Sequence, residues 1–312
     1  MTAMDQVVDA LRALPTTAFL VLQGPEVVLD YGDNTAPTYL ASARKSLLSV
    51  LFGGPVTSGV IPLGATLGDL GIDDIGGLLP GERRATVHDL LTARSGVYHP
   101  AATATGLESG APPRGSQPPG ARFHYNNWDF NALGTIFERC TGRGVFDALA
   151  EDLAAPLGFD DFDPGRQRLL GRPDRSQHLA HHFFLSGRDL GRVGRLMVRR
   201  GQWGDRRLVP ASWVVESTSV QVDMGPGAPL DYGYLWWVPR VLPAGSFLAA
   251  GNFGQYLLGV PELDLVIVHR HAVPEEAVIA RSQSLDPGLP TEGVTPRQFM
   301  ALVRSVLTAS RR

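Results

Sequence analysis

Ser42 and Lys45 lie one helical turn apart in the segment Ser42-Ala43-Arg44-Lys45. Side chains at positions i and i+3 of a helix share a face, so the hydroxyl and the amine can meet. A serine hydroxyl is a weak nucleophile that needs a base within hydrogen-bonding distance, and a buried lysine with a lowered pKa can be that base. The backbone N–H of Ser42, at a helix start, can also donate to an oxyanion. The pair predicts a serine hydrolase that forms an acyl-enzyme on Ser42.

The lysine content of the chain supports this interpretation. Lys45 is the only lysine among 28 basic residues, and all the others are arginine. A guanidinium stays protonated in proteins, whereas a desolvated ammonium can give up its proton. The chain therefore keeps one cation able to act as a base. The alternative is that Ser42 only caps a helix and Lys45 lies on a solvated surface.

Tyr125-Asn126-Asn127 supplies a third group, immediately before a helix predicted at 128–140. A tyrosine beside an ammonium has a lowered phenol pKa and can take part in proton transfer. Asn127 can donate to a substrate carbonyl or hold Lys45. The alternative is an aromatic contact at the helix start plus an asparagine cap.

In these motifs the chain resembles the serine β-lactamase-like hydrolases, which include class C β-lactamases, penicillin-binding proteins, esterases and 6-aminohexanoate-dimer hydrolases. The resemblance covers nearly the whole chain and rests on five segments in order: residues 39–46 with Ser-x-x-Lys, 89–96, Tyr125-Asn126-Asn127, 186–192 and 251–255. It implies that Ser42 is the nucleophile, Lys45 its partner and Tyr125 the general base and acid. It also implies an oxyanion hole made by the backbone N–H groups of Ser42 and Gln255.

The third motif of that family, Lys-Thr-Gly or His-x-Gly, falls here on Asn252-Phe253-Gly254. No second lysine exists to bind a substrate carboxylate, which removes a bond worth about 1.5–3 kcal/mol. Arg240 on another strand is a weak substitute. We therefore expect neutral carboxylic esters as the main substrates, then small amides, and β-lactams third. An alternative of another class is a non-catalytic binding protein with the same fold.

An aromatic cleft is expected around the motifs, because an apolar site with few polar anchors suits an acyl or aryl ester. Trp128, Phe253 and Tyr256 lie beside the motif positions, and Tyr98 begins a long loop at 99–120 that is a candidate lid. Trp236 and Trp237 are consecutive in a predicted strand, so at most one faces the site.

Other kinds of site are disfavoured. His178, His181 and His182 could suggest a metal, but partly exposed histidines near a helix start are the simpler interpretation. The chain has no Gly-x-Ser-x-Gly elbow, and Cys140 lies on an apolar helical stripe. We expect no metal and no cofactor.

Hydrophobic periodicity predicts an α+β fold, in which an antiparallel sheet flanked by helices carries an inserted, mostly helical lobe. The sheet lobe is placed at 1–40 and 201–312, and the helical lobe at 41–200. Helices are predicted at 4–14, 42–52, 87–94, 128–140, 144–153, 187–199 and 296–307, with the second stopped by Gly53-Gly54-Pro55. Strands are predicted at 17–23, 26–31, 235–238, 246–250, 255–260 and 263–269.

The bulk composition fits an ordinary globular protein, with 312 residues, 44% hydrophobic residues and a net charge of −3. Near-neutrality gives no reason to expect a nucleic acid or membrane partner. The first fifteen residues do not resemble a signal peptide, and a single cysteine suits a reducing compartment. We expect a cytoplasmic enzyme acting on a small acyl substrate; the oligomeric state stays open.

Overall fold

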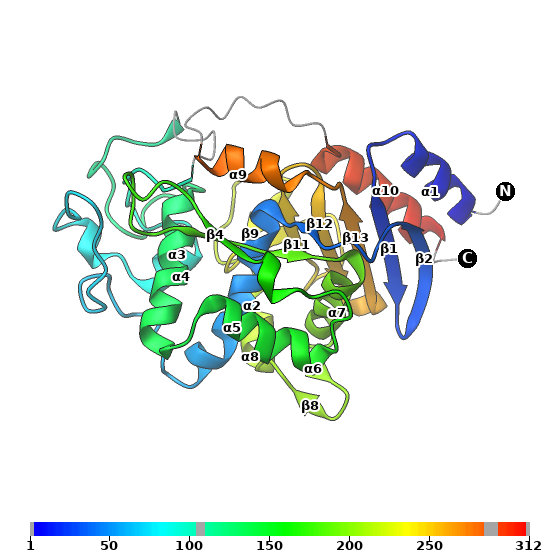
Figure 1. Cartoon of the computed structure of the whole chain (residues 1–312), viewed down its shortest axis with the longest axis horizontal. Helices are drawn as coiled ribbons and strands as arrows, with labels where there is room; N and C mark the ends of the chain where they lie inside the picture. Colours follow the sequence, from blue (N-terminus) through cyan, green and yellow to red (C-terminus); the bar gives the residue numbers. More distant parts are fainter. Residues whose placement is uncertain (1–2, 104–109, 284–292, 310–312) are drawn as a thin grey trace.

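The computed structural model describes residues 3–103, 110–283 and 293–309. Its centre is a seven-stranded antiparallel sheet in the spatial order β2-β1-β13-β12-β11-β10-β9 (Figure 1). The strands are β1 (Ala18–Gln23), β2 (Glu26–Gly32), β9 (Leu230–Tyr232), β10 (Trp237–Pro239), β11 (Phe247–Gly251), β12 (Gln255–Val260) and β13 (Leu265–Arg270). The first hairpin pairs with the last strand, with Ala18 opposite Arg270. The prediction of one sheet from both ends of the chain is confirmed.

The sheet is covered by helices on both faces, and side-chain alternation in β1 shows why. Phe19 and Val21 join one apolar cluster, which contains residues of α1 (Ala3–Arg12) and α10 (Pro296–Ala309). Leu20 and Leu22 join the other, which contains residues of α7 (Gly187–Val198). Successive strand residues point to opposite faces, so a continuously apolar strand needs cover on both. Figure 1 shows α1 and α10 together beside the first hairpin.

The remaining elements form the helical part and three small two-stranded sheets, β3 with β6, β4 with β5 and β7 with β8. The helices are α2 (Arg44–Thr57), α3 (Val87–Leu91), α4 (Asn127–Thr141), α5 (Val145–Ala148), α6 (Ala155–Leu157), α8 (Ala211–Ser217) and α9 (Glu275–Gln283). A π-helical segment covers Leu149–Ala154, and short 3-10 turns cover Ala41–Ala43, Glu82–Arg84, Pro164–Arg166 and Pro261–Leu263. The short strands are β3 (Thr38–Tyr39), β4 (Arg168–Leu170), β5 (Ala180–His182), β6 (Phe184–Leu185), β7 (Gln202–Trp203) and β8 (Arg206–Arg207).

The helix after Ser42 differs from the prediction at both ends. Ser42 lies in a 3-10 turn before α2, and the helix runs through Gly53-Gly54-Pro55 to Thr57. Gly53 serves packing rather than termination, since a Cβ there would meet the ring of Trp213 at 2.6 Å. Glycine allows α8 to pack closely against α2 at this position.

The two-lobe division stays a prediction. It places α7 in the helical lobe, although α7 packs against β1, β12 and β13. The long loop expected at 99–120 is irregular in its described parts, and positions 104–109 lie outside the described residues. No helix in the described ranges is both long and apolar enough to cross a membrane.

Candidate active site

Ser42 is presented by a strained turn between the sheet and α2. Ala41 has a φ of +48°, a left-handed conformation that costs a residue with a Cβ about 1–2 kcal/mol. The chain before it is held by Arg270 of β13, a buried residue whose guanidinium donates to Thr38 O at 2.8 Å and to Tyr39 O at 3.0 Å. The strain is thus supported by a rigid strand, as is common at functional sites.

Lys45 lies between the serine and the tyrosine. Its Nζ is 3.0 Å from Ser42 Oγ and 2.8 Å from Tyr125 Oη, and the residue is 2% exposed. The same nitrogen lies 4.3 Å from the centre of the Tyr125 ring and 4.4 Å from that of Phe130. The three predicted catalytic residues therefore meet at hydrogen-bonding distance, on the turn before α2, in its first turn and before α4.

The electrostatics of the three groups favour a neutral amine beside a neutral phenol. Burial, aided by the charge of neighbouring Arg44, holds the pKa of Lys45 well below 10.5. Burial raises the pKa of Tyr125 to about 12, against the opposing effects of a hydrogen bond with Ser42 and the charge of Arg44. The expectation that an adjacent ammonium lowers the pKa of Tyr125 is therefore wrong. Desolvation disfavours the charged form of each group and is the largest cause of both shifts.

The turn between β11 and β12, at one end of these two interior strands, forms another wall of the site. A Cβ on Gly251 would meet Leu40 O at 2.5 Å and Ser42 N at 3.0 Å, so only glycine allows this approach. Asn252 and Phe253 follow it and line the same cavities as Ser42, and Phe253 has a φ of +69°. Gly254 lines the larger of the two cavities described next.

Gln255 lies in the sheet and not on the wall of either cavity around Ser42. It is fully buried in β12 opposite Gly251. Its side chain accepts from Arg270 Nε at 2.8 Å and donates to His271 O at 2.6 Å. Gln255 is set back from both cavities because the turn ends at Gly254 and Gln255 begins β12, and its role as an oxyanion donor stays a prediction.

Two cavities meet at Ser42 and share Tyr125, Asn252 and Phe253 as lining residues. The smaller, cavity A, has a volume of about 110 Å³ and is further lined by Tyr39, Ala41, Arg44, Thr103, Asn127, His182, Val278, Arg281 and Ser282. The larger, cavity B, has a volume of about 440 Å³ and is further lined by Leu230, Trp237, Leu248, Ala250, Gly251, Gly254, Tyr256, Gly293, Val294, Thr295 and Pro296.

Two arginines line the smaller cavity beside Ser42, but Arg240 is not one of them. Its guanidinium binds Asp223 and Asp231, away from both cavities. Arg44 and Arg281 line cavity A instead. The sequence offered Arg240 as the only substitute for the missing lysine, whereas the cations next to Ser42 are these two arginines. Arg281 belongs to α9, a helix that the sequence pattern did not predict, whereas Arg44 lies inside the Ser-x-x-Lys motif and could have been noticed.

Asn127 lines cavity A but does not hold Lys45. Its Nδ2 donates to Thr103 O at 3.1 Å and to Thr103 Oγ1 at 3.2 Å. Asn126 caps α4 by accepting from Asp129 N at 2.9 Å. Thr103 was not predicted as a site residue, and no local pattern marks it.

The aromatic prediction is right for three residues and wrong for two. Phe253, Tyr256 and Trp237 line the cavities around Ser42, whereas Trp236 is fully buried against Phe247. Trp128 is buried elsewhere, and Tyr98 lines a separate cavity with it.

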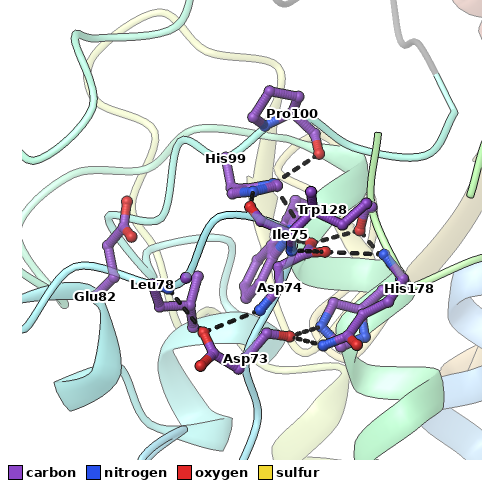
Figure 2. Close-up of polar contacts among 12 residues, drawn as sticks. Asp73, Asp74, Ile75, Leu78, Glu82, His99, Pro100, Trp128 and His178 are labelled. Atoms are coloured by element: carbon purple, nitrogen blue, oxygen red, sulfur yellow. Dashed lines mark hydrogen bonds and ion pairs between the residues drawn. The ribbon is translucent and has the colours of Figure 1, made fainter. Parts of the chain in front are cut away.

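Trp128 instead belongs to a buried cluster around Asp74, shown in Figure 2. Its Nε1 donates to Asp74 Oδ2 at 2.7 Å, and Ser176 Oγ donates to the same oxygen at 2.5 Å. Asp74 Oδ1 accepts from the backbone N–H groups of Ile75 and Gln177. The prediction of Trp128 in the cleft is wrong because the direction in which the first side chains of a helix point depends on tertiary contacts.

The three histidines are buried, so the expectation of partly exposed side chains is wrong. His178 contacts Thr135 Oγ1 at 2.9 Å and Asp73 O at 2.9 Å, and His181 pairs with Glu138 at 3.1 Å. His182, in β5, lines cavity A and stacks on Tyr39 with ring centres 5.2 Å apart. No group of metal-ligating side chains occurs among the described residues.

Comparison with known proteins identifies the family. The family model Beta-lactamase matches residues 4–270. A curated relative, the Monacolin J acid methylbutanoyltransferase of Aspergillus terreus, is 31% identical over an alignment of 168 residues, and the match covers 44% of this chain and 40% of that protein. The matched region thus spans less than half the length of that relative.

Solved structures share the fold at low identity. A structure described as a 6-aminohexanoate-dimer hydrolase from Bacillus anthracis has a TM-score of 0.73 and 18% identity, over 97% of this chain and 81% of that one. A family VIII carboxylesterase has a TM-score of 0.66 and 15% identity, over 99% and 98%. A β-lactamase from Mycobacterium bovis has a TM-score of 0.63 and 21% identity, over 97% and 99%. With the family model matching most of its length, this chain belongs to the Beta-lactamase family.

Proposed function

We propose that this protein hydrolyses carboxylic esters through an acyl-enzyme on Ser42, with Lys45 as the base. The observation that carries the proposal is the position of one buried amine 3.0 Å from Ser42 Oγ and 2.8 Å from Tyr125 Oη. A neutral amine at that distance can take the serine proton without first losing its own, which an arginine cannot do.

Acylation follows from this geometry. Ser42 Oγ attacks the ester carbonyl while its proton passes to Lys45 Nζ, and the carbonyl oxygen becomes an oxyanion. The backbone N–H groups of Ser42 and Asn252 are the proposed donors to that oxyanion. The C–O bond to the leaving group then breaks, and the departing alkoxide takes a proton from the Lys45 ammonium, directly or through Tyr125. Water then gives a proton to the same amine and attacks the acyl carbon. The bond to Ser42 Oγ breaks, the acid is released, and Ser42 takes a proton back from Lys45.

The test uses p-nitrophenyl butyrate turnover together with intact-protein mass after treatment with a fluorophosphonate. The wild-type chain is expected to give ester turnover and one adduct on Ser42, and Ser42→Ala to lose both. Ser49→Ala is the matched control, because Ser49 lies buried on the same helix with a hydroxyl that has no partner among the described residues. Absence of turnover and of any adduct would support the non-catalytic binding protein instead.

The substrate panel adds an aminohexanoate dimer and nitrocefin. We expect the ester to be turned over fastest, the small amide next and nitrocefin near background. The fused ring system of nitrocefin holds its carboxylate rigidly and close to the scissile bond, whereas the arginines that could bind it line the smaller of the two cavities, at about 110 Å³. Nitrocefin turnover faster than ester turnover would overturn this order.

A second candidate, acyl transfer to an alcohol, is favoured by the relative named as a methylbutanoyltransferase. The acyl-enzyme is common to both reactions, and only the acceptor differs. Added alcohols that speed p-nitrophenol release without increasing free acid would show transfer. We also propose the cytoplasm as the compartment, which cell fractionation tests.

A further inference from the structure

Cavity A has the charge of an anion-binding site. Arg44 and Arg281 line it, and none of its lining residues within 3–103, 110–283 and 293–309 is an aspartate or glutamate. Arg44 is 4% exposed, and one of its terminal nitrogens donates to Asn131 Oδ1 at 3.0 Å. The centre of the Arg281 guanidinium lies 5.1 Å from the ring of Phe253. Two guanidinium groups beside one small cavity, with no carboxylate among its described lining residues, create a positive potential next to the serine.

Cavity A also holds buried polar atoms that lack partners within the described residues. Both ring nitrogens of His182 are unpartnered, although the residue is only 5% exposed. One terminal nitrogen of Arg281 and Asn127 Oδ1 are unpartnered as well. Buried polar atoms in folded proteins are nearly always hydrogen-bonded, so each exception needs an explanation. A ligand that supplies acceptor oxygens would satisfy the guanidinium and the imidazole N–H together.

Cavity B has the opposite character. Most of its lining is apolar, including Leu230, Trp237, Leu248, Tyr256 and Val294. The cavity is about four times as large as cavity A, at about 440 Å³ against 110 Å³. Because Ser42 lies on both walls, the two parts of a substrate on either side of its scissile carbonyl meet different surroundings.

We propose that the substrate is an ester that carries a carboxylate on one side of the scissile bond and an apolar group on the other. Cavity A binds the carboxylate through Arg281, Arg44 and His182, and cavity B holds the apolar group. This inference rests on the proposed ester hydrolysis and adds the class of substrate. A cavity of about 110 Å³ has the volume of roughly four water molecules, which suits a carboxylate with a short carbon chain.

The binding energy comes from charge-assisted hydrogen bonds between the carboxylate and the guanidinium groups in a buried cavity. A carboxylate accepts charge-assisted hydrogen bonds from a guanidinium, and these are about twice as strong as neutral ones. Burial, followed by the charge of Arg44, holds the pKa of His182 well below 6.5, so its ring stays neutral and offers one N–H. A neutral ester group in the same cavity would leave the unpartnered donors unsatisfied, which sites built for polar groups reject strongly.

The experiment compares two matched substrate pairs, one for each side of the bond. p-Nitrophenyl hydrogen glutarate against its methyl ester places the carboxylate on the acyl side. 4-(Butyryloxy)benzoate against its methyl ester places it on the leaving-group side. In the wild-type protein, one pair is expected to favour its anionic member by on the order of tenfold or more in kcat/KM. The favoured pair identifies which side of the ester occupies cavity A.

Variants then locate the charge. Arg281→Gln is expected to remove most of that preference, and Arg281→Lys to keep part of it. His182→Phe, which keeps the stacking on Tyr39, is expected to raise KM for the anionic member more than for the neutral one. Arg206→Gln is the matched control, because Arg206 is an exposed arginine in the β7–β8 hairpin and far from the site in sequence. It changes net charge equally and should leave the preference intact.

A readout on the wild-type chain needs no variant. Hexanoate should inhibit neutral-ester hydrolysis at a concentration on the order of tenfold lower than hexanamide, and added salt should weaken it. Equal rates within both pairs, together with equal inhibition, would overturn the substrate class and leave ester hydrolysis standing. Absence of turnover on all four esters, with no adduct on Ser42, would overturn both proposals.

Discussion

Two buried polar clusters flank the start of α4 and differ in how well their groups are satisfied. Around Asp74, both carboxylate oxygens accept hydrogen bonds, among them those of Trp128 and Ser176 (Figure 2). Around Ser42, an amine is buried beside a hydroxyl and a phenol, and His182 nearby has no partner in the described chain.

The pKa values follow the same difference. Burial raises the pKa of Asp74, but hydrogen bonds from Ser176, Gln177 and Trp128 outweigh it and leave the pKa lowered. The pKa of Lys45 is shifted toward the neutral form by burial. A buried carboxylate stabilised by several donors holds structure together, whereas a buried amine shifted toward its neutral form can act as a base.

Lys45→Arg tests the cluster around Ser42 and has the largest expected effect on activity. The variant keeps the positive charge but loses the base, so kcat/KM for p-nitrophenyl butyrate should fall by roughly 10²–10⁴-fold. The melting temperature, measured alongside, separates this loss from unfolding. Activity within a few-fold of wild type would remove Lys45 from the mechanism.

Gly251→Ala tests how closely the end of β11 must approach the turn that carries Ser42. The added Cβ would lie 2.5 Å from Leu40 O, so strand and turn must separate. A displacement near 1 Å at a catalytic group can cost on the order of 10²-fold in kcat, which is the fall expected here. Gly64→Ala is the control, since a Cβ there meets nothing within 4 Å. Equal activities of the two variants would contradict the close packing.

Asp74→Asn tests the satisfied cluster and should act on stability. The amide nitrogen cannot accept, so one or two buried donors lose their partner, at a cost of about 2–3 kcal/mol in the free energy of unfolding. Urea unfolding measures this loss at neutral pH. Activity per folded molecule should change little, because Asp74 lines neither cavity around Ser42. Loss of activity without loss of stability would erase the distinction between the clusters.

Asp129 lies between the two cases, because only one of its two carboxyl oxygens has a hydrogen-bond partner among the described residues. Burial raises its pKa to about 8 against opposing hydrogen bonds from Ser95 and Asn126, and its Oδ2 is unpartnered. A folded-state pKa above the unfolded value of 3.8 means that the contribution of Asp129 to stability is greatest below pH 3.8 and is lost as the pH rises through 8. Asp129→Asn should flatten this pH dependence in urea unfolding. A wild-type stability that rises over the same range through this group would refute the shift.

Local patterns predicted much of the fold. The hairpin of β1 and β2, the strand β12 and the helix α4 with its Asn126 cap and Gly142 end follow from periodicity and capping over short stretches. The end of α2 was not predictable in this way, because Gly53 is used for contact with Trp213 rather than as a stop signal.

The residues of the candidate site also fall into those that local patterns predict and those that only tertiary contacts bring together. Ser42, Lys45 and Tyr125 were found because two of them share one turn and the third belongs to a short motif. Arg281 and the orientation of Trp128 could not be found, since each depends on contacts between segments more than fifty residues apart.

The pKa of Lys45 is the quantity on which the mechanism depends, and the chain offers a direct way to measure it. Because Lys45 is the only lysine, lysine labelled with ¹³C at Cε gives a single side-chain signal without assignment. A titration followed by NMR should show this signal changing well below pH 10.5. A signal that titrates at or above pH 10.5 would mean that the amine is an ordinary ammonium, and would contradict its role as the base for Ser42.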